Sequence, residues 1–112
     1  MKYTLPLPPT GTNHAYHTNQ GRWYKDSKVT GWEADCLYRL KGKVKKITKE
    51  NITVNICFYD GDKRRRDIDG RIKSVLDLFT KAGAYEDDLM VMSLIVTKRY
   101  DKESPRMEVD IY

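Results

Sequence analysis

The segment over residues 51–59 constrains the fold most, because apolar and polar side chains alternate along it. Four apolar residues recur at every second position: Ile52, Val54, Ile56 and Phe58. A period of two places these side chains on one face of an extended chain. The segment is therefore expected to be a strand whose apolar face is buried in the domain.

Two other segments show the spacing of amphipathic helices. In residues 27–40 the apolar positions are Val29, Trp32, Cys36, Leu37 and Leu40. In residues 69–82 they are Ile72, Val75, Leu76 and Phe79. Gly83 is a natural stop for the second helix, because glycine readily adopts the left-handed conformation. Each helix is expected to pack its apolar stripe against the sheet.

Three further segments are expected to be strands: residues 1–7, 89–98 and 106–112. The turn at 101–105 would join the last two as an antiparallel hairpin, and the strand from residue 89 would pack near residues 51–59. Residues 12–25 have no clear period and are expected to be a long loop. The order strand, helix, strand, helix, strand, strand predicts an α+β fold. It would be a single domain over residues 1–112, with two helices packed on a mixed sheet.

The bulk composition narrows the possible partners and the compartment. The chain has 21 lysine and arginine residues against 16 aspartate and glutamate residues, a net charge of +5. This excess favours polyanionic partners such as nucleic acid. No apolar run approaches the roughly 20 residues that span a bilayer, and the N-terminus lacks a secretion signal. We therefore expect a cytoplasmic protein with no membrane partner.

The stretch over residues 63–73 is the strongest candidate for chemistry. Four consecutive basic residues precede two aspartates: Lys63, Arg64, Arg65, Arg66, Asp67 and Asp69. Carboxylates two residues apart in an extended chain face the same side and repel each other unless a cation lies between them. Mg²⁺, which prefers oxygen ligands, would relieve that repulsion. The basic run fits the positioning of phosphates, and Lys73 could stabilise charge that develops on a phosphate in the transition state.

A second acidic group, Glu86-Asp87-Asp88, follows the second predicted helix. It can come near Asp67 only if the next strand returns beside residues 51–59, which the expected sheet permits. Period alone does not decide whether Asp87 or Asp88 points inward.

These acids also have purely structural interpretations. Asp67 or Asp69 could cap the second helix. Charges that alternate every four residues are typical of a solvated helix face, and such a series is present: Asp69, Lys73, Asp77 and Lys81. The second acidic group could be an ordinary turn. Sequence alone leaves both kinds of interpretation open.

The segment before the first helix is rich in aromatic residues, among them Tyr16, Trp23 and Tyr24, which could stack on unpaired bases. His14 and His17 have no cysteine or acidic partner at a metal-ligand spacing, which argues against zinc. No phosphate-binding loop, dinucleotide fingerprint or nucleophile elbow is present, so no organic cofactor is expected.

Taken together, these motifs form a specific combination that runs through the chain: Arg65-Arg66-Asp67-Ile68-Asp69, Lys73, Asp77, Leu78-Phe79-Thr80-Lys81-Ala82-Gly83 and Asp87-Asp88. The opening Leu5-Pro6-Leu7-Pro8-Pro9-Thr10, with Asn13 and Tyr16 beyond it, adds an N-terminal motif. The combination resembles the RusA family of Holliday-junction resolvases over essentially the whole chain.

The resemblance implies a homodimer that cuts four-way DNA junctions by paired nicks and requires Mg²⁺, with Mn²⁺ as a substitute. By motif match, the catalytic and metal-binding carboxylates would be Asp67, Asp69 and Asp88, with Asp87 as the alternative to Asp88. Lys73 matches the family's essential lysine. The residues assigned to DNA binding are Lys63, Arg64, Arg65, Arg66, Arg71, Asn13 and Tyr16.

One position departs from the family pattern, because Gly70 stands where the family usually has asparagine. Glycine cannot orient a metal-bound water, so we expect an effect on cleavage rate or metal geometry rather than on the fold. Three functions follow as alternatives: a junction resolvase, a branched-DNA-binding protein of the same fold that has lost turnover, and a basic adaptor with no DNA role. A resolvase of this kind could be encoded by a bacterium or by a prophage.

Overall fold

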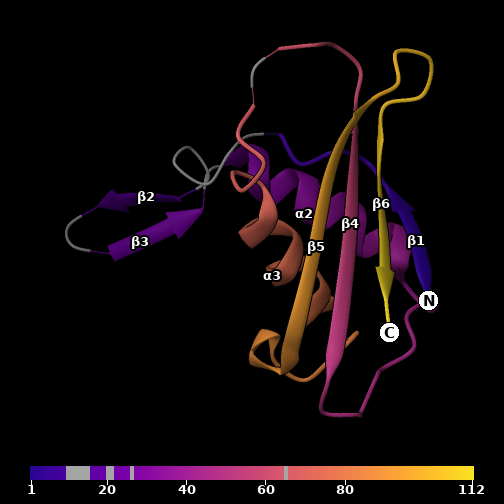
Figure 1. Cartoon of the computed structure of the whole chain (residues 1–112). Coiled ribbons are helices and arrows are strands. Elements are labelled where there is room, and N and C mark those ends of the chain that lie inside the picture. The colour runs from indigo at the N-terminus through magenta and orange to yellow at the C-terminus, as the bar shows by residue number, and fades with distance from the viewer. Residues whose placement is uncertain (10–15, 20–21, 26, 65) are drawn as a thin grey trace.

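The computed structural model describes residues 1–9, 16–19, 22–25, 27–64 and 66–112. This part of the chain contains two α-helices, one 3₁₀ helix and six strands (Figure 1). Their bounds are β1 (Lys2–Leu5), β2 (Tyr16–Asn19), β3 (Arg22–Lys25), α2 (Ser27–Leu40), β4 (Ile52–Asp60), α3 (Ile72–Ala82), η1 (Asp88–Met90), β5 (Val91–Tyr100) and β6 (Arg106–Ile111).

The main sheet has four strands in the order β1-β6-β4-β5. β4 pairs in parallel with β5, which places Val54 opposite Leu94, and it pairs antiparallel with β6. β1 pairs antiparallel with the other edge of β6. The sheet is therefore mixed, and the expected return of the strand after residue 89 beside residues 51–59 is confirmed.

The expected hairpin between the last two strands is wrong, because β4 lies between β5 and β6. The connection over residues 101–105 passes the end of β4, where the amide of Asp101 donates a hydrogen bond to the Asp60 carbonyl at 2.8 Å. Alternation identifies a strand and its faces, but it does not say which strand lies beside it. Here β4 accepts β5 on one edge and β6 on the other.

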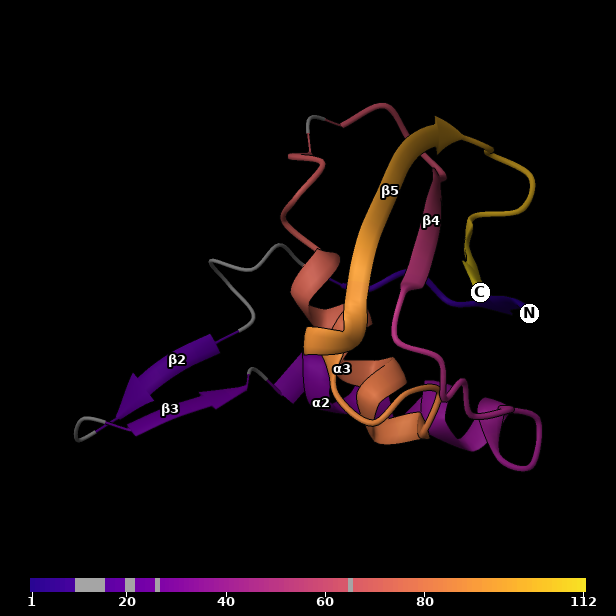
Figure 2. The same ribbon diagram turned by 60° about the horizontal axis from the view of Figure 1, so that its bottom comes forward.

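Helices α2 and α3 cover one face of this sheet (Figures 1 and 2). β4 supplies the centre of the core, since its alternating apolar side chains are all buried: Ile52, Val54, Ile56 and Phe58. Val75, Leu78 and Phe79 of α3 belong to the same buried cluster. The predicted α+β architecture of two helices on a mixed sheet is confirmed.

Helix α3 begins later than the apolar pattern indicated. Residues 68–71 form a turn before it, and the amide of Ile72 donates to the Asp69 carbonyl at 3.3 Å. The predicted stop is correct: Gly83 has a φ of 83°, and its amide donates to the Thr80 carbonyl at 3.1 Å. The later start leaves Asp69 on the loop rather than on the helix.

Residues 12–25, expected to be a loop, contain the hairpin of β2 and β3. Tyr16 lies opposite Lys25 and Asn19 opposite Arg22. The hairpin projects from the body as a separate two-stranded sheet (Figures 1 and 2). Neither strand joins the main sheet. Their sequence therefore lacks the alternation of apolar residues by which a half-buried strand is recognised.

The helices of this protein are short relative to the thickness of a lipid bilayer. Within the described ranges, none has both the length and the apolar character needed to cross a membrane. The longer of the two α-helices, α2, has 14 residues, fewer than the roughly 20 that a membrane-spanning helix needs.

Candidate active site

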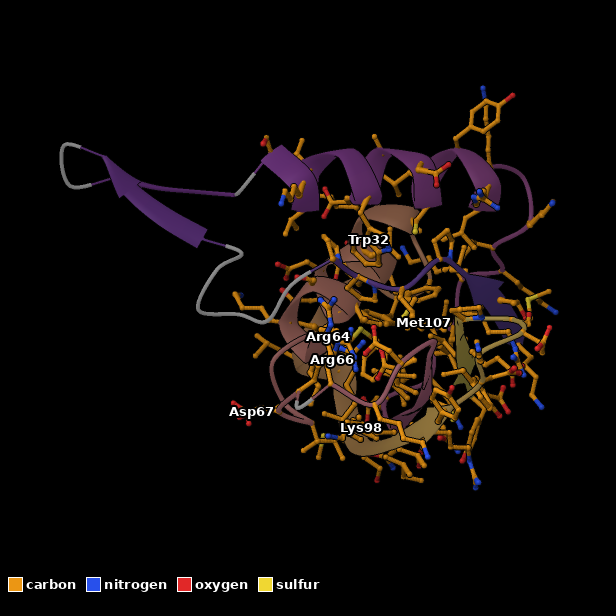
Figure 3. All side chains as sticks on the ribbon, turned by 90° about the horizontal axis from the view of Figure 1, so that it is seen from above. Trp32, Arg64, Arg66, Asp67, Lys98 and Met107 are labelled. Carbon is orange, nitrogen blue, oxygen red and sulfur yellow. The ribbon has the colours of Figure 1, made fainter. Side chains whose placement is uncertain are left out.

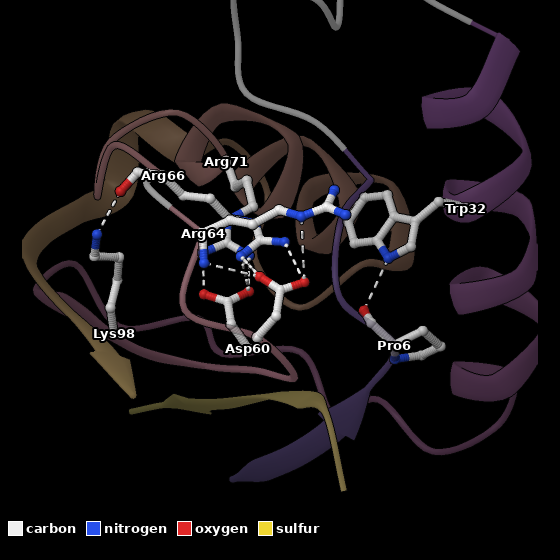
Figure 4. A network of polar contacts seen from close by, with 8 residues as sticks. Pro6, Trp32, Asp60, Arg64, Arg66, Arg71 and Lys98 are labelled. Atoms are coloured by element: carbon white, nitrogen blue, oxygen red, sulfur yellow. Dashed lines mark hydrogen bonds and ion pairs between the residues drawn. The ribbon is translucent and has the colours of Figure 1, made fainter. Parts of the chain in front are cut away.

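The loop over residues 61–71 connects β4 to α3 and carries most of the predicted site residues. Asp60, at the end of β4, and Arg71, before α3, are both buried. Arg71 donates two hydrogen bonds to the Asp60 carboxylate, at 2.7 Å from Nη1 and 3.1 Å from Nη2 (Figure 4). Its guanidinium carbon lies 4.1 Å from the centre of the Phe58 ring. This bidentate pair ties the end of the strand to the start of the helix and so positions the loop between them.

The assignment of Arg71 to DNA binding is therefore wrong. Its side chain is 4% exposed and is paired with Asp60, so it could reach a phosphate only by leaving a buried carboxylate without its partner. The sequence carries a signal for a buried carboxylate at Asp60, although it does not say which basic residue pairs with it. The period-two burial pattern of β4 continues to Asp60, which places a carboxylate on the buried face and requires a cation beside it.

Arg66 is half-buried beside the same pair. Its Nη1 lies 2.8 Å from the Asp62 carboxylate and 3.9 Å from that of Asp60. The hydrogen bond from Arg66 lowers the pKa of the Asp62 carboxyl to about 2. Lys98 of β5 donates a hydrogen bond to the backbone carbonyl of Arg66 (Figure 4). Arg66 thus anchors the loop to the sheet in addition to placing a positive charge near the surface.

The other members of the basic run differ in their availability. The Arg64 side chain is 82% exposed, with its Nε 3.8 Å from the Asp62 carboxylate. Lys63 is also exposed, and its ammonium lies 5.3 Å from the centre of the Tyr100 ring. Arg65 lies outside the described residues. Lys63 and Arg64 are therefore the described residues of the run that a DNA phosphate could reach most easily.

Asp67 and Asp69 lie on this loop directly before α3. Both are exposed, and Figure 3 shows Asp67 pointing away from the body of the protein. Neither forms an ion pair with another residue in the described ranges. The capping interpretation is not supported, because the residue at the N-terminal boundary of α3 is Arg71, and its side chain makes no capping hydrogen bond. Two exposed carboxylates without such roles are available to a cation.

Asp87 and Asp88 have different roles at the start of η1. The Asp87 carboxylate caps η1 by accepting a hydrogen bond from the amide of Leu89 at 2.9 Å. Asp88 is half-buried; this burial, and the nearby carboxylates of Asp87 and Asp77, raise the pKa of its carboxyl. A cation bound nearby would offset the repulsion from these neighbouring carboxylates. Asp88 is therefore the better candidate for a ligand of the two.

Lys73 lies in the first turn of α3, within electrostatic reach of Asp88. Its Nζ is 3.9 Å from the Asp77 carboxylate, and its charge partly offsets the rise in the pKa of Asp88. The predicted ladder of alternating charges does not continue along the helix, because Lys81 pairs with the buried Glu33 of α2 at 2.6 Å. The face of α3 near Asp88 thus carries one lysine and one aspartate.

The three predicted catalytic aspartates are not gathered into a metal-ligand cluster. Within the described part of the chain, no group of three or more His, Cys, Asp or Glu side chains is arranged to hold an ion. Asp67 and Asp69 are on the loop before α3, whereas Asp88 is at η1. Their carboxylate oxygens are donors that Mg²⁺ prefers, but their positions do not fit a three-carboxylate site. Among the described residues the three carboxylates therefore come from two separate segments, and their shared metal site stays a prediction.

Comparison with known proteins shows a likeness over nearly the whole chain. The family described as Endodeoxyribonuclease RusA matches residues 6–112. Crossover junction endodeoxyribonuclease RusA of Aquifex aeolicus is 30% identical over 101 residues, which cover 89% of this chain and 80% of the relative. The protein of the same name from Enterobacteria phage 82 is 31% identical over 109 residues, 96% of this chain and 90% of the relative. That of Escherichia coli K12 is 30% identical over the same lengths.

Proposed function

Since this chain belongs to the RusA family of endodeoxyribonucleases, we propose that it is a metal-dependent endonuclease that cuts four-way DNA junctions by paired nicks. The observation that carries the proposal is the family match over residues 6–112, which spans the acidic and basic loop and the turn before β5. The curated relatives named crossover junction endodeoxyribonucleases have similar lengths. The net charge of +5 and the exposed carboxylates of the loop agree with a DNA substrate and a cation.

We assign the metal ligands to Asp67, Asp69 and Asp88, and the ion to Mg²⁺ with Mn²⁺ as a substitute. Beside a phosphodiester, such an ion supplies stabilisation of negative charge and a lowered pKa of an attacking water. Asp67 and Asp69 are accessible, and the raised pKa of Asp88 would be relieved by a cation. Because these carboxylates are apart in this structure, one ion could bind all three only in a different arrangement of the segments. Lys73, whose ammonium is exposed, would stabilise charge on the phosphate.

A synthetic four-way junction tests the proposal. The protein is incubated with the labelled junction and with a linear duplex of the same sequence, in Mg²⁺ or in chelator. We expect nicks at two positions in the junction with Mg²⁺, none with chelator, and none in the duplex. Binding without cleavage in either Mg²⁺ or Mn²⁺ would indicate a DNA-binding protein, and no junction binding at low salt would contradict any role on branched DNA.

Arg64→Ala is expected to weaken junction binding and to reduce the slope of log affinity against log salt by about 1, because each phosphate contact releases about one counterion. Arg64 suits this test because its side chain is exposed and its ion-pair partner, Asp62, is exposed as well. Lys49→Ala, an exposed lysine outside the loop, is the matched control and should leave the slope unchanged. Equal slopes for wild type and Arg64→Ala would contradict a phosphate contact at this position.

The hairpin of β2 and β3 is the second segment that we assign to DNA. It projects on the same side of the molecule as Asp67 (Figures 1 and 3). Residues 16–25 contain no acidic residue, but they include Tyr16, Arg22, Trp23, Tyr24 and Lys25. A projecting ribbon of this composition suits unpaired bases and phosphates at the centre of a junction. Tyr16 and Asn13 stay proposed DNA contacts. The backbone of Tyr16 is among the described residues but its side chain is not, and Asn13 lies outside them altogether.

We also propose that the active protein is a homodimer that forms along β5. β5 is an edge strand of ten residues, because among the described strands it pairs with β4 alone. Large apolar side chains on it, and one just before it, are exposed: Leu89, Met92, Leu94, Ile95 and Tyr100. A long apolar edge strand invites pairing with another chain. A second copy related by a two-fold axis would cover the same surface on both protomers.

Ile95→Lys is expected to convert the dimer into a monomer, because it would place two charges in a small apolar interface. Light scattering at micromolar concentration should give twice 13.1 kDa for the wild type and 13.1 kDa for the variant. Tyr112→Lys is a matched control, since both side chains are 46% exposed and Tyr112 is not on β5. A dimeric Ile95→Lys would contradict the β5 surface, and a monomeric wild type would contradict the dimer.

One observation favours the alternative function of a branched-DNA-binding protein without turnover. Gly70, the position that departs from the family pattern, lies in the turn before α3, and its amide donates to the Asp67 carbonyl at 3.3 Å. It offers no side chain to orient a carboxylate or a water beside the two aspartates. If this limits the chemistry, the junction will be bound and cut slowly or not at all, which the assay in Mg²⁺ and Mn²⁺ distinguishes.

A further inference from the structure

An open groove of about 840 Å³ lies between β1 and the C-terminal end of α2. Residues 1–5 form one wall, and residues 38–43 contribute to the other. The groove lies across the molecule from the loop that carries Asp67. β1 and the N-terminus are at the right of Figure 1, whereas Asp67 is at the left of Figure 3, which keeps the same left and right. The groove is therefore separate from the candidate active site.

The groove is strongly positive. Five positive groups line it: the Met1 ammonium, Lys2, Arg39, Lys41 and Lys43. Two of them are paired, the ammonium with Asp110 at 3.2 Å and Arg39 with Asp35 at 3.2 Å. The other three are exposed lysines that form no ion pair with another described residue. Five positive charges less two negative ones leave an excess of +3 beside one concave surface, which is a suitable site for a polyanion.

An exposed aromatic ring stands at the edge of this groove. Tyr38 on α2 is 80% exposed, the second highest value among the large hydrophobic residues that are exposed, and it lines the groove together with the lysines. Most of the ring is therefore accessible to a ligand. A tyrosine beside unpaired lysines provides a flat surface for a sugar or a base next to a phosphate.

We propose that this groove binds the phosphate backbone of a junction arm, at a distance from the loop where the DNA would be cut. The inference rests on the proposed function and adds a second DNA contact to it. The chain extends over 41 Å along its longest axis. One turn of B-DNA spans about 34–36 Å, so an arm of one to two turns is long enough to contact both places.

DNA suits the groove better than an acidic peptide added to the edge of β1 would. β1 has four residues, so a peptide strand could form few backbone hydrogen bonds with it. Three exposed lysines that form no ion pair within the described ranges are typical of contacts that position a phosphate backbone without reading its sequence. The expected binding is therefore independent of sequence and sensitive to salt.

Arm length provides the test. Two junctions with the same centre are made with arms of about 8 and about 20 base pairs, roughly 27 and 68 Å long. Wild type should bind the long-arm junction several-fold more tightly at low salt. In the variant Lys41→Ala/Lys43→Ala, the preference for the long-arm junction should fall. The slope of log affinity against log salt for that junction should also decrease by about 2. The control Lys28→Ala/Lys102→Ala removes two exposed lysines elsewhere and should keep the preference.

The outcomes separate this inference from the proposed function. The groove variant should cut the short-arm junction at the wild-type rate, because neither lysine belongs to the loop. An arm-length preference equal to that of the control would overturn the groove contact while leaving the nuclease proposal intact. Failure of the wild type to bind or cut either junction would overturn the nuclease proposal. If polyglutamate binds at the groove and long-arm DNA does not compete with it, the DNA contact would be overturned in favour of an acidic peptide.

Discussion

Replacing Asp69 with asparagine is expected to lower the rate of junction cleavage by at least about 10²-fold, the scale of removing one group that stabilises a transition state. Junction affinity should stay close to that of the wild type. The exposed Asp69 side chain forms no ion pair with another described residue, so the fold does not depend on it. Single-turnover cleavage in Mg²⁺ and a binding titration, made on the same junction, measure the two quantities separately.

Glu103→Gln is the matched control for this substitution, because it removes one exposed carboxylate from the turn between β5 and β6. Its cleavage rate should be that of the wild type. A cleavage rate for Asp69→Asn within about twofold of the control would remove Asp69 from the catalytic group. A parallel loss of junction binding would instead indicate that the aspartate supports the DNA surface.

Arg71→Ala is expected to lower the free energy of unfolding by about 3–5 kcal/mol, the usual cost of removing one partner from a buried ion pair. The substitution leaves the buried Asp60 carboxylate without its two hydrogen bonds and removes the guanidinium from the Phe58 ring. Unfolding in urea measures the change. Arg64→Ala, at an exposed arginine of the same loop, should change it by no more than about 0.5 kcal/mol.

The double variant Asp60→Leu/Arg71→Met shows whether this cost comes from the isolated charge. Replacing both partners by apolar residues should cost much less than Arg71→Ala alone, because no buried carboxylate is left unpaired. A loss below about 1 kcal/mol for Arg71→Ala would mean that the pair does not hold the loop. A double variant that is stable but cuts slowly would show that the pair positions Asp67 and Asp69.

The elements predicted well are those that pack on the core. The alternating strand over residues 51–59 and the apolar stripe of residues 27–40 appear where their periods indicated, because burial on one face determines the period. Two other expectations were wrong because burial does not determine them. Residues 12–25 were expected to be a loop, but they contain the β2–β3 hairpin, which does not join the main sheet. The last two strands were expected to pair as a hairpin, but strand order, which the period does not encode, places β4 between β5 and β6.

The candidate site shows the same division between local pattern and long-range arrangement. Sequence placed Asp67 and Asp69 next to a basic run at the entry to the second helix, and the structure leaves both exposed on the loop before α3. It could not distinguish Arg71 from the exposed arginines, because the buried partner Asp60 is eleven positions away. Sequence also could not decide whether Asp88 lies beside the other two aspartates, since that depends on how η1 and the loop are placed around α3.

Binding of Mn²⁺ in the presence of a junction tests the central claim most directly. Free Mn²⁺ is followed by electron paramagnetic resonance in titrations of the wild type and of Asp67→Asn, Asp69→Asn and Asp88→Asn, with Asp87→Asn as the control. We predict that each of the three variants binds Mn²⁺ at least about tenfold more weakly, and that the control binds it as the wild type does. Wild-type affinity in all three variants would contradict a metal site shared by these aspartates.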